Sequence, residues 1–144
     1  LIHLLEPLDP KLYGQRGTCS DGVDVLLFRQ GPDCLMAWRF EVKSSKSDSQ
    51  SFKDTQRMWE QYQGYLDLLR KYGIMTYYAF RSKSRNHRGM ATADKWRIFR
   101  VDRLPLSRNK TPKLAIAGPA GPLGSLSYGW TIGEFYEKCV RRVW

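Results

Sequence analysis

The stretch DVLLFRQGPDCLMAWRFEVK, from Asp24 to Lys43, decides the fold. Residues 23–28 are rich in β-branched and aromatic side chains, and they predict a short strand. Residues 31–33, Gly-Pro-Asp, supply a turn, because glycine tolerates a positive φ and proline fixes its own. Residues 35–44 then predict a longer returning strand, so the stretch is expected to form a β-hairpin.

The register of this hairpin brings together three chemically active side chains. Counting outward from the turn, Asp24 lies about eight residues back and Glu41 about nine residues forward, so the two carboxylates should lie on neighbouring strands. Glu41 and Lys43 are two residues apart and share one face of their strand, while Val42 points to the opposite face. The pattern therefore predicts two acids and one amine at one end of the hairpin.

Two converging carboxylates form a hard oxygen site that suits Mg²⁺ or Mn²⁺. Such a cation lowers the pKa of water and stabilises charge on a phosphate, and a nearby lysine can hold or deprotonate the attacking water. The alternative is a salt bridge at the edge of a strand, in which Glu41 pairs with Lys43 or Arg39. The matched upstream Asp24 favours the metal site over this alternative.

The pattern Asp24…Glu41-Val42-Lys43-Ser44 resembles the core of the PD-(D/E)XK nucleases, and most closely that of the archaeal-type Holliday junction resolvases. The resemblance covers about residues 17–104. It implies an α/β, restriction-endonuclease-like core in which a mixed central sheet is flanked by helices. It also implies that Asp24, Glu41 and the backbone carbonyl of Val42 bind the metal, and that Lys43 positions the nucleophilic water.

The activity of the family that the sequence resembles sets the expected function. The resemblance implies a metal-dependent DNA endonuclease that selects branched DNA, in particular four-way junctions, and acts as a homodimer in recombination and repair. Resolvases of this type carry a further acid on a first helix, and Glu6 is the candidate for it here. Two alternatives stay open: a RecB-like exonuclease or nuclease module of a larger helicase, repair or replication protein, and a DNA-binding module without catalytic activity.

Composition bounds the class of protein. The 144 residues suit a single domain over 1–144, with a C-terminal wrapping segment and helix over 105–144. The net charge of +10 indicates a nucleic-acid partner. No run is apolar enough to span a bilayer, so we expect no membrane partner and a cytoplasmic protein in a nucleoid or viral DNA context. Three widely spaced cysteines do not suit a zinc or iron–sulfur site.

The segment after the hairpin predicts a helix followed by a strand. Apolar residues recur at steps of three and four over 52–72, and Gly73 ends the helix. Within it, Gln61-x-x-x-Tyr65 resembles the QxxxY element of RecB-like nucleases, which implies a role for Gln61 beside the catalytic water. Residues 74–80 predict a strand that runs parallel to a central strand of the sheet.

Residues 81–95 form a basic loop whose length and single sign of charge favour contact with a DNA backbone. The following segment, 96–101, predicts a half-exposed strand, and 105–129 reads as an irregular segment. Thr131 and Glu134 form a capping box that opens a last helix. The residues expected to bind DNA, which include those of the serine-rich connection after the hairpin, are Ser44, Lys46, Arg81, Lys83, Arg85, Arg88, Lys95 and Arg97.

Overall fold

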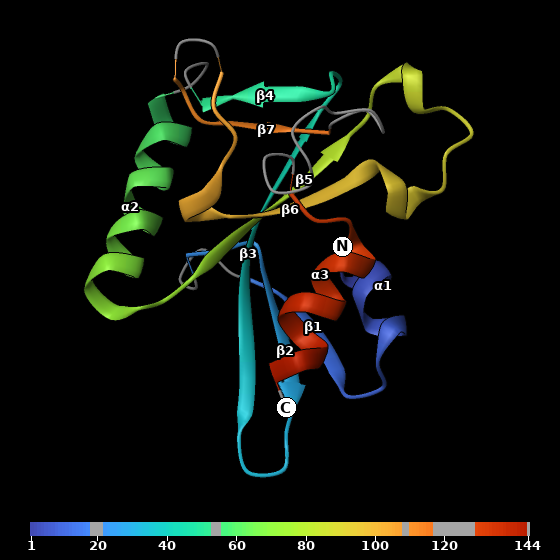
Figure 1. The fold of residues 1–144 in the computed structure, drawn as a ribbon, viewed down its shortest axis with the longest axis vertical. Helices are drawn as coiled ribbons and strands as arrows, with labels where there is room; N and C mark the ends of the chain where they lie inside the picture. The colour runs from blue at the N-terminus through green and yellow to red at the C-terminus, as the bar shows by residue number, and fades with distance from the viewer. Residues whose placement is uncertain (18–21, 53–55, 108–109, 117–128, 144) are drawn as a thin grey trace.

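The structure is a computed structural model of the chain, and it describes residues 1–17, 22–52, 56–107, 110–116 and 129–143. Its centre is a sheet of five strands in the order β1-β2-β3-β5-β6 (Figure 1). All neighbouring pairs are antiparallel except β3 and β5, which are parallel. The predicted mixed central sheet is therefore confirmed. Its bounds are β1 Leu12–Arg16, β2 Val25–Gln30, β3 Leu35–Ser45, β5 Thr76–Ser82 and β6 Trp96–Arg100.

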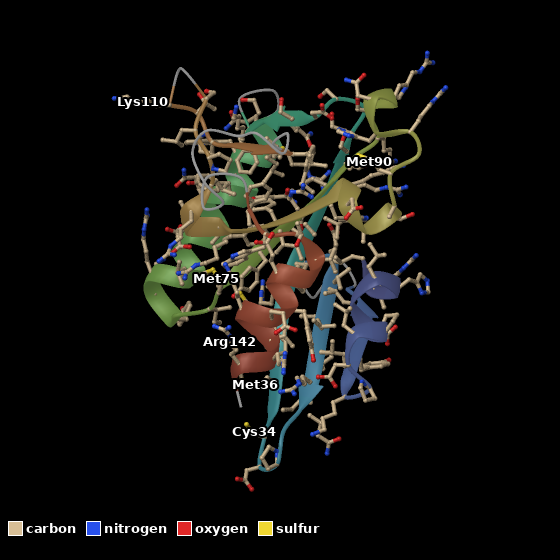
Figure 2. All side chains as sticks on the ribbon, turned by 45° about the vertical axis from the view of Figure 1, so that its right-hand side comes forward. Cys34, Met36, Met75, Met90, Lys110 and Arg142 are labelled. Atoms are coloured by element: carbon tan, nitrogen blue, oxygen red, sulfur yellow. The ribbon has the colours of Figure 1, made fainter. Side chains whose placement is uncertain are left out.

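The hairpin of β2 and β3 has the predicted register. Val25 lies opposite Phe40 and Gln30 lies opposite Leu35, and the turn between them is closed by Gly31 N–H donating to the carbonyl of Cys34. Cys34 marks the tip of this long hairpin in Figure 2. The first strand begins two residues later than predicted, so Asp24 stands just before it, where the register places it beside the Glu41 position.

Helix α2 covers one face of the sheet and connects β3 to the parallel strand β5 (Figure 1). It spans Gln56–Tyr72 and ends at Gly73, whose φ of 68° is a conformation that glycine adopts without strain. The prediction placed the start of this helix at Phe52, which follows strand β4 and is fully buried in the core beneath α2, and residues 53–55 lie outside the described residues. A crossover helix of this kind is what allows two neighbouring strands to run parallel.

The second face of the sheet is covered by the two ends of the chain. Helix α1 (Ile2–Leu5) and the turn η1 (Glu6–Leu8) precede β1, a strand that the sequence analysis did not predict. At the other end, the predicted capping box of Thr131 and Glu134 opens α3 (Ile132–Phe135), which continues through η7 (Tyr136–Val140) and η8 (Arg141–Val143). Leu5, Phe135 and Val140 are fully buried in this core layer.

One expectation about the connecting segments was partly wrong. In the serine-rich connection, Ser44 and Ser45 end β3 and residues Ser49–Ser51 form β4. Strand β4 pairs antiparallel with β7 (Lys113–Ala115), which lies in the stretch predicted to be irregular. Much of that stretch, 117–128, lies outside the described residues.

Strand β6 is more buried than its alternating sequence predicted. Ile98 and Phe99 are both nearly fully buried, since one joins the core layer of α3 and the other the core layer of α2. The short turns η3 (Arg85–His87), η4 (Thr92–Lys95) and η5 (Val101–Arg103) flank this strand along the chain. In the part of the chain that the structure describes, no helix is long and apolar enough to cross a membrane.

Candidate active site

Glu41 is held in place by the helix that covers the sheet. Its side chain points to the α2 face of β3, and the residue is only 4% exposed. Tyr65 of α2 donates its hydroxyl to Oε2 of Glu41 at 2.8 Å, and the same hydroxyl lies 3.1 Å from the carbonyl of Gly22. Burial, together with the hydrogen bond and charge of Glu41, raises the pKa of Tyr65 well above its usual value, so its hydroxyl remains a proton donor.

Asp24 approaches from the neighbouring strand and is exposed. Its backbone N–H donates to the carbonyl of Phe40, which extends the ladder of β2 and β3 by one bond. Its Oδ2 accepts a hydrogen bond of 2.8 Å from the backbone N–H of Val42. This bond fixes the Asp24 carboxylate beside the Glu41-Val42-Lys43 backbone, as the register had predicted.

Lys43 links strand β3 to helix α2. Its Nζ lies 3.1 Å from Oε1 of Glu41 and donates to Oε1 of Gln61, also at 3.1 Å. The salt bridge that was the alternative prediction therefore exists, with Lys43 as the partner of Glu41. It does not stand apart from a site, however, because Lys43 also contacts Gln61 and lines the same pocket as both acids. The Lys43 amine therefore forms an ion pair with Glu41, and its residue also lines an open pocket.

These side chains line one pocket, which we call the acidic pocket. It brings together the predicted Asp24, Glu41, Val42, Lys43 and Gln61 with residues that the sequence analysis missed; its full lining is Gly17, Gly22, Val23, Asp24, Glu41, Val42, Lys43, Gln50, Arg57, Met58 and Gln61. A sequence signal existed for Arg57, which is four residues before Gln61 and so on the same helix face. None existed for Gln50, because it enters the site through the unpredicted pairing of β4 with β7.

The donor set of the acidic pocket fits a hard divalent cation. Asp24 is exposed to the pocket, and its Oδ1 has no hydrogen-bond partner among the described residues. Glu41 adds a second carboxylate, whose Oε1 lies 3.1 Å from the Lys43 amine. Two carboxylates with neighbouring carbonyl oxygens are the ligands that Mg²⁺ and Mn²⁺ prefer.

A third acid does not join this pair within the described ranges. Glu6, the candidate from the sequence, lies outside the acidic pocket, and its Oε2 accepts a hydrogen bond from Gly14 N–H at 3.3 Å. No group of three or more His, Cys, Asp and Glu side chains suited to a metal occurs among those residues. The candidate metal site therefore consists of two carboxylates and backbone oxygen.

Most of the side chains expected to bind DNA gather in a second pocket, which we call the basic pocket. It is lined by Lys46, Arg81, Ser82, Lys83, Ser84, Arg85, Arg88 and Lys95. Two predicted residues are not part of its lining. Ser44 is exposed on β3, and the guanidinium of Arg97 bonds to the backbone carbonyls of Asp94 and Trp96 at 3.0 and 2.7 Å.

Comparison with known proteins found similarity among solved structures but not among sequences. No family model matches the chain, and no curated protein is significantly similar to it in sequence. Among solved structures, the chain is similar to a Holliday junction resolvase from the archaeal hyperthermophile Archaeoglobus fulgidus, with a TM-score of 0.47 and 19% identity over 78% of this chain and 77% of that one.

The topology of the chain itself matches the predicted core. An acid stands at the start of β2, the Glu-x-Lys sequence lies on β3, and a crossover helix leads to a parallel β5. The fold is an α/β fold around a five-stranded mixed sheet. Helices on both faces of the mixed sheet complete the predicted α/β architecture (Figure 1).

Proposed function

We propose that this protein is a divalent-metal-dependent DNA endonuclease that selects branched DNA, with the four-way junction as its main substrate. The observation that carries the proposal is the convergence of Asp24, Glu41 and Lys43 in one pocket, with the Lys43 amine 3.1 Å from Glu41. Two acids and an amine at this spacing suit phosphodiester hydrolysis.

Each side chain has a defined part in this chemistry. Asp24, Glu41 and the Val42 carbonyl would hold Mg²⁺ or Mn²⁺, which supplies charge stabilisation at the phosphate and a lowered pKa of water. Lys43 donates hydrogen bonds to the attacking water and orients it toward the phosphorus. Gln61 fixes the Lys43 amine through its amide oxygen. Tyr65 fixes the orientation of the Glu41 carboxylate from the opposite side.

The charge of the molecule supports DNA as the substrate. The chain carries a net charge of +10, and six cations line the basic pocket at the ends of β3 and β5. Contacts of this kind bind the sugar–phosphate backbone and not base edges, which suits an enzyme that selects DNA by shape. We further propose a homodimer, because resolving a junction requires two cuts in paired strands, and a role in recombination or repair of intracellular DNA.

One observation favours a second candidate function, that of a RecB-like exonuclease. Gln61 and Tyr65, four residues apart on α2, contact Lys43 and Glu41 respectively. The QxxxY resemblance implies a role for Gln61 beside the catalytic water, and its contact with Lys43 supports that role. The same placement serves an endonuclease equally well, so the preferred substrate must distinguish the two.

Cleavage of three labelled substrates under single-turnover conditions tests the proposal. We expect the protein to cut a four-way junction in Mg²⁺ at paired internal positions, to cut a matched linear duplex far more slowly, and to lose all activity in a chelator. Stepwise loss of nucleotides from duplex ends would favour the exonuclease. Binding without cleavage of any substrate in Mg²⁺ or Mn²⁺ would leave a non-catalytic DNA-binding module.

A further inference from the structure

The basic pocket is held in place by hydrogen bonds and is not a row of independently solvated cations. It lies where the parallel strands β3 and β5 end side by side, with Ser45 opposite Ser82. The backbone N–H of Lys83 donates to the carbonyl of Ser45 at 2.7 Å, which ties the start of the basic loop to the end of β3. Figure 2 shows this loop, marked by Met90, at the end of the molecule opposite the hairpin tip at Cys34.

Hydrogen bonds order the loop that carries the cations. Ser82 Oγ accepts from the N–H of Ser84 at 3.2 Å, and Ser84 Oγ in turn accepts from the N–H of Asn86 at 3.2 Å. Ser82 also donates to Asp48 at 2.9 Å, and the same Asp48 oxygen bonds to His87. The loop therefore holds its cations on an ordered frame, which reduces the entropy lost when a ligand binds.

The positive charge of the pocket is not neutralised by the protein. Among the described residues, none of its six cations makes a salt bridge or a side-chain hydrogen bond; they are Lys46, Arg81, Lys83, Arg85, Arg88 and Lys95. Asp48, which accepts a hydrogen bond from the pocket residue Ser82, is also engaged by His87. Six cations gathered in one hollow repel one another, so the site is stabilised when an anion enters it.

Arg81 is the arginine at the end of β5, and it lines the pocket while only partly exposed. Its Nε is buried and has no hydrogen-bond partner within the described part of the chain, as is true of several other buried polar atoms there. A guanidinium presents parallel N–H groups that match two oxygens of a phosphate, so the part of Arg81 that lines the pocket is suited to hold one.

We propose that the basic pocket is a discrete phosphate-binding site, in which Arg81 anchors one phosphate group of the DNA beside the catalytic centre. The naming of DNA as the source of this phosphate rests on the proposed function. Ser45, the last residue of β3 and the chain neighbour of the pocket residue Lys46, is two residues beyond Lys43, a distance of roughly 7 Å along a strand. A phosphate bound here therefore fixes how the DNA continues past the point of cleavage.

Binding of fluorescent DNA in a chelator, at several salt concentrations, tests this site without cleavage. Arg81→Gln should weaken binding by about tenfold or more, and it should lower the slope of log K against log salt by roughly 0.9 for the one lost contact. Arg81→Lys keeps the charge but loses the two-pronged geometry, so it should retain the slope and still bind more weakly. Arg103→Gln, at an exposed arginine of η5, is the matched control and should change neither the affinity nor the slope by as much.

Three DNA ligands identify the source of the phosphate: one duplex with terminal phosphates, the same duplex with hydroxyl ends, and a closed dumbbell. A loss confined to the phosphorylated ends assigns the pocket to a terminal phosphate, and an equal loss on all three assigns it to the internal backbone. Because Arg81 is partly buried, melting temperatures are measured in parallel, and the exposed Arg88→Gln provides a second variant of the pocket.

Unchanged affinity and slope for both Arg81→Gln and Arg88→Gln would overturn the proposal. That result can be told apart from a failure of the proposed function. If the wild type binds DNA through this pocket but cleaves nothing, the result supports the proposed phosphate site and rejects the proposed nuclease activity. If the wild type cleaves DNA while the pocket variants bind normally, the result supports the proposed nuclease activity and rejects the proposed phosphate site.

Discussion

Asp9 and Glu41 are both buried carboxylates, at 6% and 4% exposure, but their surroundings differ in kind. Both oxygens of Asp9 are engaged, one by a nearby backbone group and the other by two side chains from distant parts of the chain. Oδ1 accepts from the N–H of Lys11 at 2.9 Å, and Oδ2 accepts from Arg29 at 3.0 Å and from the Tyr136 hydroxyl at 2.9 Å. Asp9 thus joins the N-terminal segment, strand β2 and the C-terminal helical segment.

Glu41 has fewer hydrogen-bond and ion-pair partners than Asp9, and it lines the acidic pocket. Tyr65 engages one oxygen, while the other faces the amine of Lys43, whose side chain is 22% exposed. The exposed Asp24 lies next to it in the same pocket. Burial alone therefore does not separate a structural carboxylate from a functional one. The difference is whether the carboxylate converges with other reactive groups on a space that a substrate can enter.

The largest expected effect comes from removing the charge of Glu41. Glu41→Gln should reduce cleavage in Mg²⁺ by about 10³-fold or more, because an amide is a poor ligand for a hard cation and the charge stabilisation it supports is worth several kcal/mol. Single-turnover cleavage of a four-way junction measures this effect. The matched control is Asp9→Asn, which changes the other buried carboxylate and should cut at nearly the wild-type rate. Equal losses in the two variants would remove the distinction drawn between them.

Lys43 should give the next largest effect. Lys43→Ala should lower the cleavage rate by about 10²-fold, as for the loss of a general acid–base group, with folding and metal binding retained. Lys43→Arg keeps the ion pair with Glu41 but replaces the compact amine with a planar guanidinium, so its activity should also fall. A normally active Lys43→Arg would reduce Lys43 to a salt-bridge partner. Melting temperature, measured alongside, separates loss of activity from loss of fold.

Tyr65 should have a smaller effect, because it acts through Glu41. Tyr65→Phe removes the hydroxyl that fixes Oε2 of Glu41 and should raise the Mg²⁺ concentration needed for half-maximal cleavage by about tenfold. Tyr62→Phe is the matched control, since Tyr62 lies on the same helix and packs its ring on Phe52. If both variants require the same Mg²⁺ concentration as the wild type, Tyr65 has only a packing role.

The smallest effect on activity and the clearest effect on stability should come from Asp9→Asn. It weakens the charged hydrogen bonds to Arg29 and Tyr136 and should lower the free energy of unfolding by about 1–3 kcal/mol at pH 7. Thermal or urea unfolding measures this change. An unaltered melting temperature would mean that Asp9 does not hold the two ends of the chain together.

The pH dependence of this stability has a definite sign. Burial acts to raise the pKa of Asp9, but hydrogen bonds from Lys11, Tyr136 and Arg29 outweigh it and leave the pKa below its usual value. The stabilisation is therefore present above the unfolded-state pKa of about 3.9 and is lost as the pH falls through the folded-state pKa. The difference between wild type and Asp9→Asn should shrink from pH 7 to pH 3.

The sequence predicted that Asp24, Glu41 and Lys43 lie together because all three are local in a hairpin. Residue counting from the turn sets which side chains are opposite, so the proximity of Asp24 to Glu41 followed from the register alone. The parallel strand after α2 was also predictable, since a helix of that length leads back to the same edge of the sheet. The capping box at Thr131 is a local signal as well, and it was confirmed.

What the sequence did not predict depends on contacts between distant segments. Strand β4 exists because Ser49–Ser51 pair with Lys113–Ala115, more than sixty residues away, and this pairing brings Gln50 into the acidic pocket. Asp9 carries no local signal either, because its partners Arg29 and Tyr136 come from separate elements. Composition showed that the loop after β5 is basic, but only the fold shows that Lys46 joins it in one pocket.

The most direct test of the central claim is to titrate Mg²⁺ into single-turnover cleavage of a labelled four-way junction by the wild type, Asp24→Asn and Lys43→Arg. We expect paired internal cuts that depend on saturable Mg²⁺ for the wild type. We expect no cutting for Asp24→Asn at any Mg²⁺ concentration, and slow cutting with an unchanged Mg²⁺ midpoint for Lys43→Arg. Cleavage by the wild type that persists in a chelator, or wild-type rates for Asp24→Asn, would contradict a metal site at these residues.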